Sequence, residues 1–363
     1  MKKRVVISDI FAISPLGNDI SCIVDNLIYR RRYLQKDRLN FISNFSFVSN
    51  NYKIKTRIDK CSQLCIHNTA QLIRERTTCN SEMTGLITAS KNGCFESRNK
   101  YLKQLKTLEE PRLASPKDFV QSICNIPNSL ATIECRVKGI TNHYVGSSDA
   151  ALAAVWQATK CLKDGIANEM LISTFDVISD KQVGFLSMER NQNIIYSEAA
   201  ASIKVELLGN DNENNSLFEI LGTGFGSSTR IYEAVEIALA SAIRESKINK
   251  KEISFIISNS NSSEEFLRNE EIGFENVFED PVPTLLMKRY VGECFAPYPI
   301  LSLGVLSRMT GFQLLNNSLN EKDLYSSRYL NYNNIVLKKN SIIVLIGYSN
   351  FGNAVAICLK FVR

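Results

Sequence analysis

The chain has 363 residues, of which 44% are hydrophobic and 22% are charged, and its formal net charge is +6. This composition is ordinary for a globular protein with a sizeable core, and the charge is too small to indicate a nucleic-acid partner. No apolar run reaches the roughly 18–20 residues of a membrane span. The ten cysteines form neither a CxxC motif nor a paired framework, which predicts reduced thiols in the cytoplasm.

Strand-like and helix-like segments alternate through the first part of the chain, as expected for a layered α/β architecture. The predicted strands are residues 4–8, 84–88, 141–145, 169–177 and 200–208. The predicted helices are residues 19–29, 61–76, 98–108, 117–124 and 148–164.

The polar run 209–216 is the predicted boundary between two halves, because turn-forming residues fill it and no apolar period crosses it. It separates an N-terminal half, residues 1–210, from a C-terminal half, residues 211–363. The second half continues with strands 217–221, 254–257, 341–347 and 354–361 and helices 231–245, 264–277 and 296–315. In helix 231–245 the apolar residues recur at helical spacing, which predicts a buried face made of Ala234, Ile237, Ala238 and Ala242.

Two motifs are similar to cofactor sites, but local structure explains them more simply. Cys61 and Cys65 lie one helical turn apart with His67 nearby, yet a fourth metal ligand is missing, so no metal is expected. The segment 222–226 reads Gly-Thr-Gly-Phe-Gly after a strand, but it lacks the further glycine of a dinucleotide fingerprint. A tight turn is the simpler interpretation, and no cofactor is expected.

Other segments stand in a familiar order along nearly the whole chain. They are Ser14-Pro-Leu-Gly after the first strand, the stretch 116–139, the helix 154–167 with its Asp-Gly end, Ser197-Glu-Ala-Ala, and the segment 347–354, Gly-Tyr-Ser-Asn-Phe-Gly-Asn-Ala. Together with the motif at 288–293, described next, they resemble the β-ketoacyl synthases. The resemblance implies a five-layered α/β/α/β/α thiolase fold made of two similar halves.

Three positions that carry the ketosynthase reaction differ from the family pattern. That reaction needs a Cys nucleophile at a helix N-terminus and two His that assist decarboxylation and stabilise an oxyanion. The matching positions hold Ser148, Ser260 and Glu293, while Lys288 of the family's Lys-x-x-x-Gly-His motif is retained. No catalytic residue is therefore expected, and Lys288 is expected to neutralise Glu293 in a salt bridge.

Ser148 with the neighbouring Asp149 could also suggest a hydrolase nucleophile. The two histidines, His67 and His143, match neither catalytic position, so no triad can form, and a serine at a helix start is commonly an N-cap. Two alternatives stay open on the same fold. One is a Ser-dependent acyltransferase or malonyl decarboxylase that requires Ser148, and the other is a stand-alone acyl-binding scaffold.

A ketosynthase frame without its nucleophile resembles the chain-length factor, the ketosynthase β subunit of type II polyketide synthases. The resemblance implies a heterodimer with an active ketosynthase and a growing chain delivered by an acyl carrier protein. The product would be an aromatic, antibiotic-type polyketide or an aryl polyene. Phe119, Ile123 and Ile133 precede the nucleophile position and are the expected tunnel and interface residues. The chain departs from the family in having Ser148 where Gln is usual, and in lacking the usual signature between residues 177 and 197.

Overall fold

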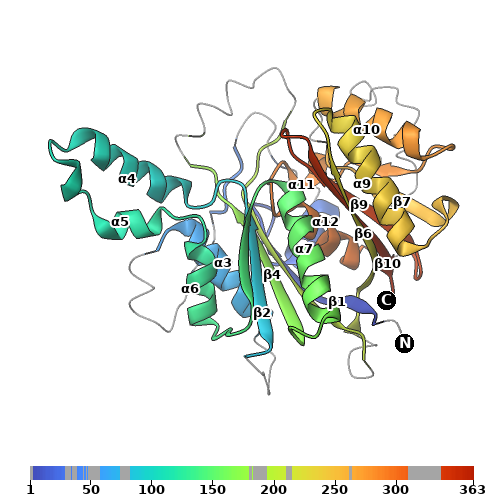
Figure 1. Ribbon diagram of the computed structural model, residues 1–363, viewed down its shortest axis with the longest axis horizontal. Coiled ribbons are helices and arrows are strands. Elements are labelled where there is room, and N and C mark those ends of the chain that lie inside the picture. Colours follow the sequence, from blue (N-terminus) through green and yellow to red (C-terminus); the bar gives the residue numbers. More distant parts are fainter. Residues whose placement is uncertain are drawn as a thin grey trace.

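The computed structural model describes residues 3–28, 34, 39–43, 45, 47, 58–73, 82–179, 182, 194–209, 215–260, 264–309 and 337–363. Its strands are β1 (Val5–Ile13), β2 (Thr84–Ser90), β3 (Thr141–Val145), β4 (Glu169–Asp176), β5 (Ala199–Leu207), β6 (Phe218–Ser227), β7 (Ile253–Ile257), β8 (Thr284–Leu285), β9 (Ile342–Tyr348) and β10 (Asn353–Phe361). In this part of the chain they form one 10-stranded sheet in the order β3-β2-β4-β5-β1-β6-β10-β9-β7-β8 (Figure 1).

The two halves of this sheet share one topology. From the centre outward the order is β1-β5-β4-β2-β3 in the first half and β6-β10-β9-β7-β8 in the second half. Each half therefore places its first, fifth, fourth, second and third strand in the same sequence. The inner pairs are antiparallel and the outer pairs are parallel on each side. The halves join where Val5 to Ile7 of β1 pair with Ile220 to Phe218 of β6. Two similar halves are therefore confirmed, while the exact boundary at residue 210 stays a prediction because residues 210–214 lie outside the described ranges.

The helices divide into one central and two outer layers. They are α1 (Ile20–Ile28), α3 (Lys60–Gln71), α4 (Phe95–Thr107), α5 (Pro116–Gln121), α6 (Ile126–Glu134), α7 (Ser148–Lys163), α9 (Ile231–Ser246), α10 (Glu264–Val277), α11 (Lys288–Val291) and α12 (Tyr298–Arg308). Helices α7 and α12 contact strands of both halves, which places them between the two halves of the sheet. Helices α3 and α6 cover one outer face, and α9 and α10 cover the other (Figure 1). This is the five-layered thiolase arrangement.

The glycine-rich segment 222–226 is not a turn, contrary to the sequence-based prediction. It lies inside β6, and a Cβ on Gly226 would stand 1.9 Å from the carbonyl oxygen of Ala234 in α9. The glycines therefore let strand and helix approach closely. The buried face of α9 includes Ala234, Ala238 and Ala242, whereas Ile237, expected on that face, is 46% exposed.

Helix ends differ from the prediction where proline or local contacts decide them. The predicted helix 117–124 is the shorter α5, and a second helix that the sequence analysis missed, α6, follows it with Pro127 in its first turn. Proline is tolerated there because the first N–H groups of a helix have no intrahelical partner. The predicted ends at residues 76 and 315 lie outside the described ranges.

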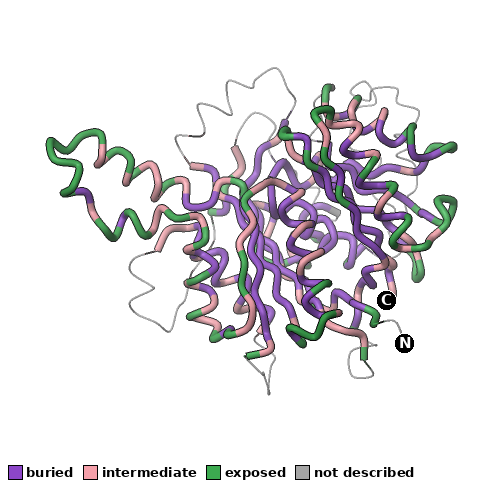
Figure 2. Tube along the Cα trace, in the orientation of Figure 1, coloured by how far each residue is buried: buried purple, intermediate pink, exposed green. Residues whose placement is uncertain are grey.

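Residues 95–123 form a helical hairpin, called the arm below, that projects from the body (Figure 1). It contains α4, a short 3-10 turn (Pro111–Leu113) and α5. No residue of α4 is buried, and Figure 2 shows the arm mostly exposed beside a buried sheet. Its main internal anchor is Asp118, which accepts hydrogen bonds from Lys100 Nζ at 2.9 Å and Gln104 Nε2 at 2.6 Å.

Candidate functional site

Ser148 opens α7 in the central layer and is fully buried. Its Oγ donates a hydrogen bond to the carbonyl oxygen of Phe295 at 3.2 Å. A Cβ on Gly347 would stand 2.7 Å from the Ser148 carbonyl carbon, so the closing segment packs directly against this backbone. The hydroxyl proton is therefore held by a carbonyl rather than by a base that could activate the oxygen.

Lys288 and Glu293 form a buried ion pair, as anticipated from the sequence. Lys288 Nζ lies 2.7 Å from Glu293 Oε2, and the two side chains are only 3% and 7% exposed. Glu293 Oε1 also accepts a hydrogen bond from the Phe295 N–H at 2.9 Å. The Phe295 backbone thus connects Glu293 to Ser148 through its N–H and its carbonyl oxygen, and its φ is positive, at 60°. We call this group of residues, Ser148, Lys288, Glu293 and Phe295, the vacated site.

Ser260 follows β7 and joins the same neighbourhood through a chain of contacts. Its N–H donates to Ser258 Oγ at 2.9 Å, while its own buried Oγ has no hydrogen-bond partner. Ser258 Oγ donates to the carboxylate of Glu270, and the Tyr298 hydroxyl donates to the Ser258 carbonyl. The Tyr298 ring in turn lies 4.7 Å from Lys288 Nζ. The positions that the sequence aligned with catalytic groups are therefore gathered in one region.

Two buried acids beside this region were not singled out from the sequence. Asp176 ends β4 and accepts hydrogen bonds from the backbone N–H groups of Lys91, Asn92 and Ala296. Burial raises the pKa of Asp176 to about 7, although these bonds oppose the shift. Burial likewise raises the pKa of Glu270 to about 7. In the sequence, Asp176 is a single acidic residue at the end of a strand, and Glu270 is one within a polar helix. Such residues are too common to identify a functional site.

The remaining candidate nucleophiles and ligands are held by structural contacts. Burial raises the pKa of the Cys294 thiol well above its usual range, so the thiol next to Glu293 stays neutral. His143 Nδ1 lies 2.8 Å from Thr88 Oγ1, and burial lowers the pKa of this imidazole to about 4. His67 packs against the rings of Phe11 and Phe45. Among the described residues, no group of three or more His, Cys, Asp or Glu could hold a metal ion.

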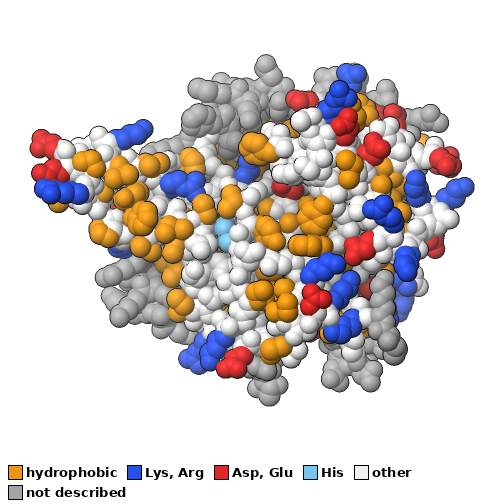
Figure 3. Space-filling view, viewed as in Figure 1, with side chains coloured by type: hydrophobic (Ala, Val, Ile, Leu, Met, Phe, Trp, Pro, Cys, Tyr) orange, Lys and Arg blue, Asp and Glu red, His pale blue; other side chains and the backbone are white. Residues whose placement is uncertain are grey.

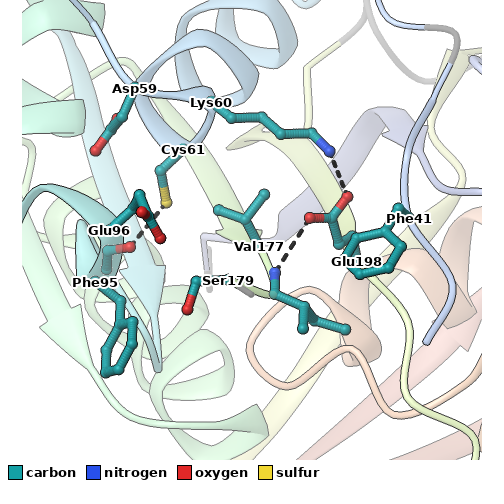
Figure 4. Close-up of a pocket in the computed structure, with 11 residues that line it drawn as sticks. Phe41, Asp59, Lys60, Cys61, Phe95, Glu96, Val177, Ser179 and Glu198 are labelled. Atoms are coloured by element: carbon teal, nitrogen blue, oxygen red, sulfur yellow. Dashed lines mark hydrogen bonds and ion pairs between the residues drawn. The ribbon is translucent and has the colours of Figure 1, made fainter. Parts of the chain in front are cut away.

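A cavity of about 360 Å³ opens between α3, the start of α4 and the segment after β4 (Figure 4). Its walls share Ile178 with the apolar cluster around Phe295. On one side Lys60 Nζ lies 2.5 Å from Glu198 Oε2, and the Glu198 carboxylate also accepts a hydrogen bond from the Ile178 N–H. The other lining residues are Phe41, Asp59, Cys61, Gly93, Phe95, Glu96, Val177 and Ser179.

The residues expected to line a tunnel lie on the surface of the described chain. Phe119 and Ile123 belong to the arm and are 48% and 40% exposed, and Ile133 on α6 is 61% exposed. None of them lines the cavity. The structure therefore places them outside the cavity and leaves their apolar side chains partly open to solvent in the single chain.

Comparison with solved structures shows the fold. The ishigamide ketosynthase/chain length factor superimposes with a TM-score of 0.84 at 13% identity, over 100% of both chains. A type II polyketide synthase ketosynthase in complex with its acyl-carrier protein gives 0.80 at 14% identity, also over 100% of both chains. The ketosynthase ApeO in complex with its chain length factor ApeC, from Xenorhabdus doucetiae, gives 0.79 at 15% identity, covering 99% of this chain and 98% of that one.

The chain thus has the ketosynthase, thiolase-like fold at full length. No protein-family model and no curated protein matches it. Across the described ranges, none of the helices combines the length and apolarity that a bilayer crossing needs.

Replacing Lys288 with Met should destabilise the protein, because Glu293 would remain buried without a cation. We expect the free energy of unfolding to fall by about 3–5 kcal/mol, measured by urea denaturation. The double variant Lys288→Met/Glu293→Gln should recover at least half of that loss, since a neutral amide still accepts from the Phe295 N–H. A single variant as stable as the parent would contradict this account of the ion pair.

The stability of the protein should depend on pH through Glu270. Its pKa is about 7 in the folded state and about 4.5 when unperturbed, so the folded chain keeps a proton that the unfolded chain loses. The stabilisation is full below pH 4.5 and is lost as the pH rises through 7, by ~3 kcal/mol. The Glu270→Gln variant lacks this titration. The unfolding free energy of the parent minus that of the variant should therefore fall by that amount as the pH rises from 4.5 to 7.5. A constant difference from pH 4.5 to 7.5 would refute it.

Proposed function

We propose that this chain is a chain-length factor, a non-catalytic partner of an active ketosynthase in type II polyketide biosynthesis. One observation carries the proposal: the chain has a full-length ketosynthase fold, and the positions that the sequence resemblance aligns with the reactive thiol and the two imidazoles are Ser148, Ser260 and Glu293. The overall frame is retained while the reacting groups are absent.

The chemistry of the vacated site supports this assignment. Condensation needs a thiolate to carry the acyl chain and neutral donors to stabilise an oxyanion. Here the Ser148 hydroxyl donates to a carbonyl, and Glu293 is an acceptor paired with Lys288. Removing even one oxyanion donor typically slows an enzyme about 100- to 1,000-fold. A Ser-dependent transferase would need a base on the Ser148 hydroxyl, whereas the rings of His67 and His143 hydrogen-bond Gln71 and Thr88.

The exposed apolar surface supports a protein partner. The large hydrophobic residues exposed on or beside the arm are Leu102, Leu108, Leu113, Phe119, Val120, Ile123, Ile133 and Val145. Figure 3 shows hydrophobic side chains gathered over the arm. Next to them β3 is the last strand of the sheet within the described ranges, where it pairs with β2. Contiguous apolar surface beside an open sheet edge is typical of an interface, and we assign it to the ketosynthase subunit.

In this proposal the acyl carrier protein brings the growing chain to the ketosynthase, and the arm helps to bound the tunnel. Phe119, Ile123 and Ile133 are our candidates for setting chain length, because their side chains are free to line a space shared with a partner. The product class is an aromatic polyketide or an aryl polyene. The described cysteines are all free thiols, which agrees with a cytoplasmic setting.

Affinity purification from the native host, with mass spectrometry and native mass, tests the pairing. We expect an equimolar complex with a ketosynthase that has the Cys-His-His set. Val120→Asp should reduce the recovered ketosynthase at least tenfold, because a charge would be buried at the interface. Ile237→Asp is the matched control, since Ile237 on α9 is 46% exposed and Val120 is 48% exposed. A homodimer without a ketosynthase would overturn the proposal in favour of a scaffold.

Product analysis of the reconstituted pathway tests whether this chain sets product length without taking part in catalysis. Phe119→Ala should shift the number of extension units in the product, because it enlarges the space beside the arm. Ser148→Ala should leave both product length and yield within about twofold of the parent, since only one buried hydrogen bond is lost. Loss of all product in Ser148→Ala, with the complex still assembled, would instead favour a Ser-dependent acyltransferase or malonyl decarboxylase.

A further inference from the structure

The only tryptophan of the chain packs against an exposed phenylalanine of the other half. Trp156 lies on α7, Phe225 lies on β6, and their rings meet edge to face with centroids 5.1 Å apart and planes inclined at 79°. Phe225 is 43% exposed, although most residues of β6 are buried. The two rings therefore form an aromatic pair at the surface, where the N-terminal half meets the C-terminal half.

Helix α7 belongs to the central layer, yet one strip of it reaches the surface. Ala153, Trp156 and Gln157 are partly exposed and Lys160 is exposed, whereas every other residue from 150 to 162 is buried. These four positions are related by steps of three or four residues, so they lie on one face of the helix. Figure 3 shows hydrophobic side chains over α7 as well as over the arm. The fold of the single chain thus leaves part of its central layer uncovered.

The polar groups beside the aromatic pair are bonded within the chain. Asn142 Nδ2 on β3 donates a hydrogen bond to Gln157 Oε1 at 2.8 Å. Thr223, which lies on β6 two residues before Phe225, donates through its N–H and its Oγ1 to Glu245 Oε2 at 2.7 and 2.8 Å. A partner would therefore gain free energy here mainly by burying the two rings. Aromatic groups surrounded by polar residues are typical of an interface hot spot.

The strip on α7 continues the surface that we assign to the ketosynthase subunit. The bond from Asn142 to Gln157 joins β3 directly to α7, and Val145 at the end of β3 is 63% exposed. A stable interface takes about 20–30 residues from each subunit. A ketosynthase that covers the arm and the edge of β3 therefore extends onto α7 and β6.

We infer that the ketosynthase subunit buries the Trp156–Phe225 pair, and that this pair is a hot spot through which both halves of the chain hold the partner. The inference rests on the proposed function and deepens it, because it adds the C-terminal half to the interface. A small ligand fits the pair poorly, since such ligands bind in concave sites and neither ring lines the cavity of Figure 4.

The dissociation constant of the copurified complex, measured by sedimentation over a dilution series, tests this contact. Trp156→Ala should raise the dissociation constant about 30-fold or more, because truncation of a hot-spot tryptophan removes most of its buried area. Ile237→Ala is the matched control, since Ile237 is also a large exposed hydrophobic residue but lies on α9, which packs on the other face of β6. The dissociation constant of this control should stay within about twofold of the parent value.

A fluorine label reads the same contact without truncating the side chain. Incorporation of 5-fluorotryptophan labels a single site, because Trp156 is the only tryptophan. Unlabelled ketosynthase should shift the fluorine NMR resonance and abolish its difference between light and heavy water, because the ring leaves the solvent. An unchanged resonance in a complex that assembles, or a parental dissociation constant for Trp156→Ala, overturns the inference and leaves the proposed function intact. Recovery of a homodimer without a ketosynthase overturns both.

Discussion

A carboxylate buried in the centre of this fold requires a cation, and Lys288 supplies it to Glu293. Removing two charges from water costs several kcal/mol for each, so a pair of this kind persists only when its geometry is good and its other lone pairs are satisfied. Both conditions hold, because Glu293 also accepts from the Phe295 N–H, and Phe295 in turn accepts from Ser148. The ion pair therefore stabilises the same turn that faces the start of α7. The pair thus holds the shape of this region through a charge contact and a backbone hydrogen bond.

This arrangement separates the frame of a ketosynthase from its chemistry. The central helices α7 and α12 pack between the two sheet halves, and the backbone of Gly347 touches Ser148 whatever side chain stands there. Asp176 adds a second constraint, because its carboxylate collects backbone N–H groups from the end of β2 and from the segment before α12. None of these contacts involves a reacting group. The fold therefore does not depend on a thiol or an imidazole at positions 148, 260 and 293.

Much of the fold could be predicted from the sequence, because β4 contains the apolar run 170–172, β7 contains the apolar run 255–257, and α7 has a clear helical period. The order of motifs also placed Ser148, Ser260 and Glu293 in one region. The sequence analysis missed α6 because Pro127 reads as a helix breaker, and it took the glycines of β6 for a turn because close packing by α9 is a tertiary effect. Asp176 was missed for the same reason, since its partners are backbone groups that no side-chain pattern reveals.

The arm shows how a surface element can be specified without a core of its own. Polar contacts from Asp118 hold its helices together, while its hydrophobic residues point to solvent in the single chain. Its described internal contacts are thus local, and its exposed apolar side chains lie on the outside. In the proposed complex a partner would bury these side chains, so the interface would be specified by the surface of the arm rather than by a core.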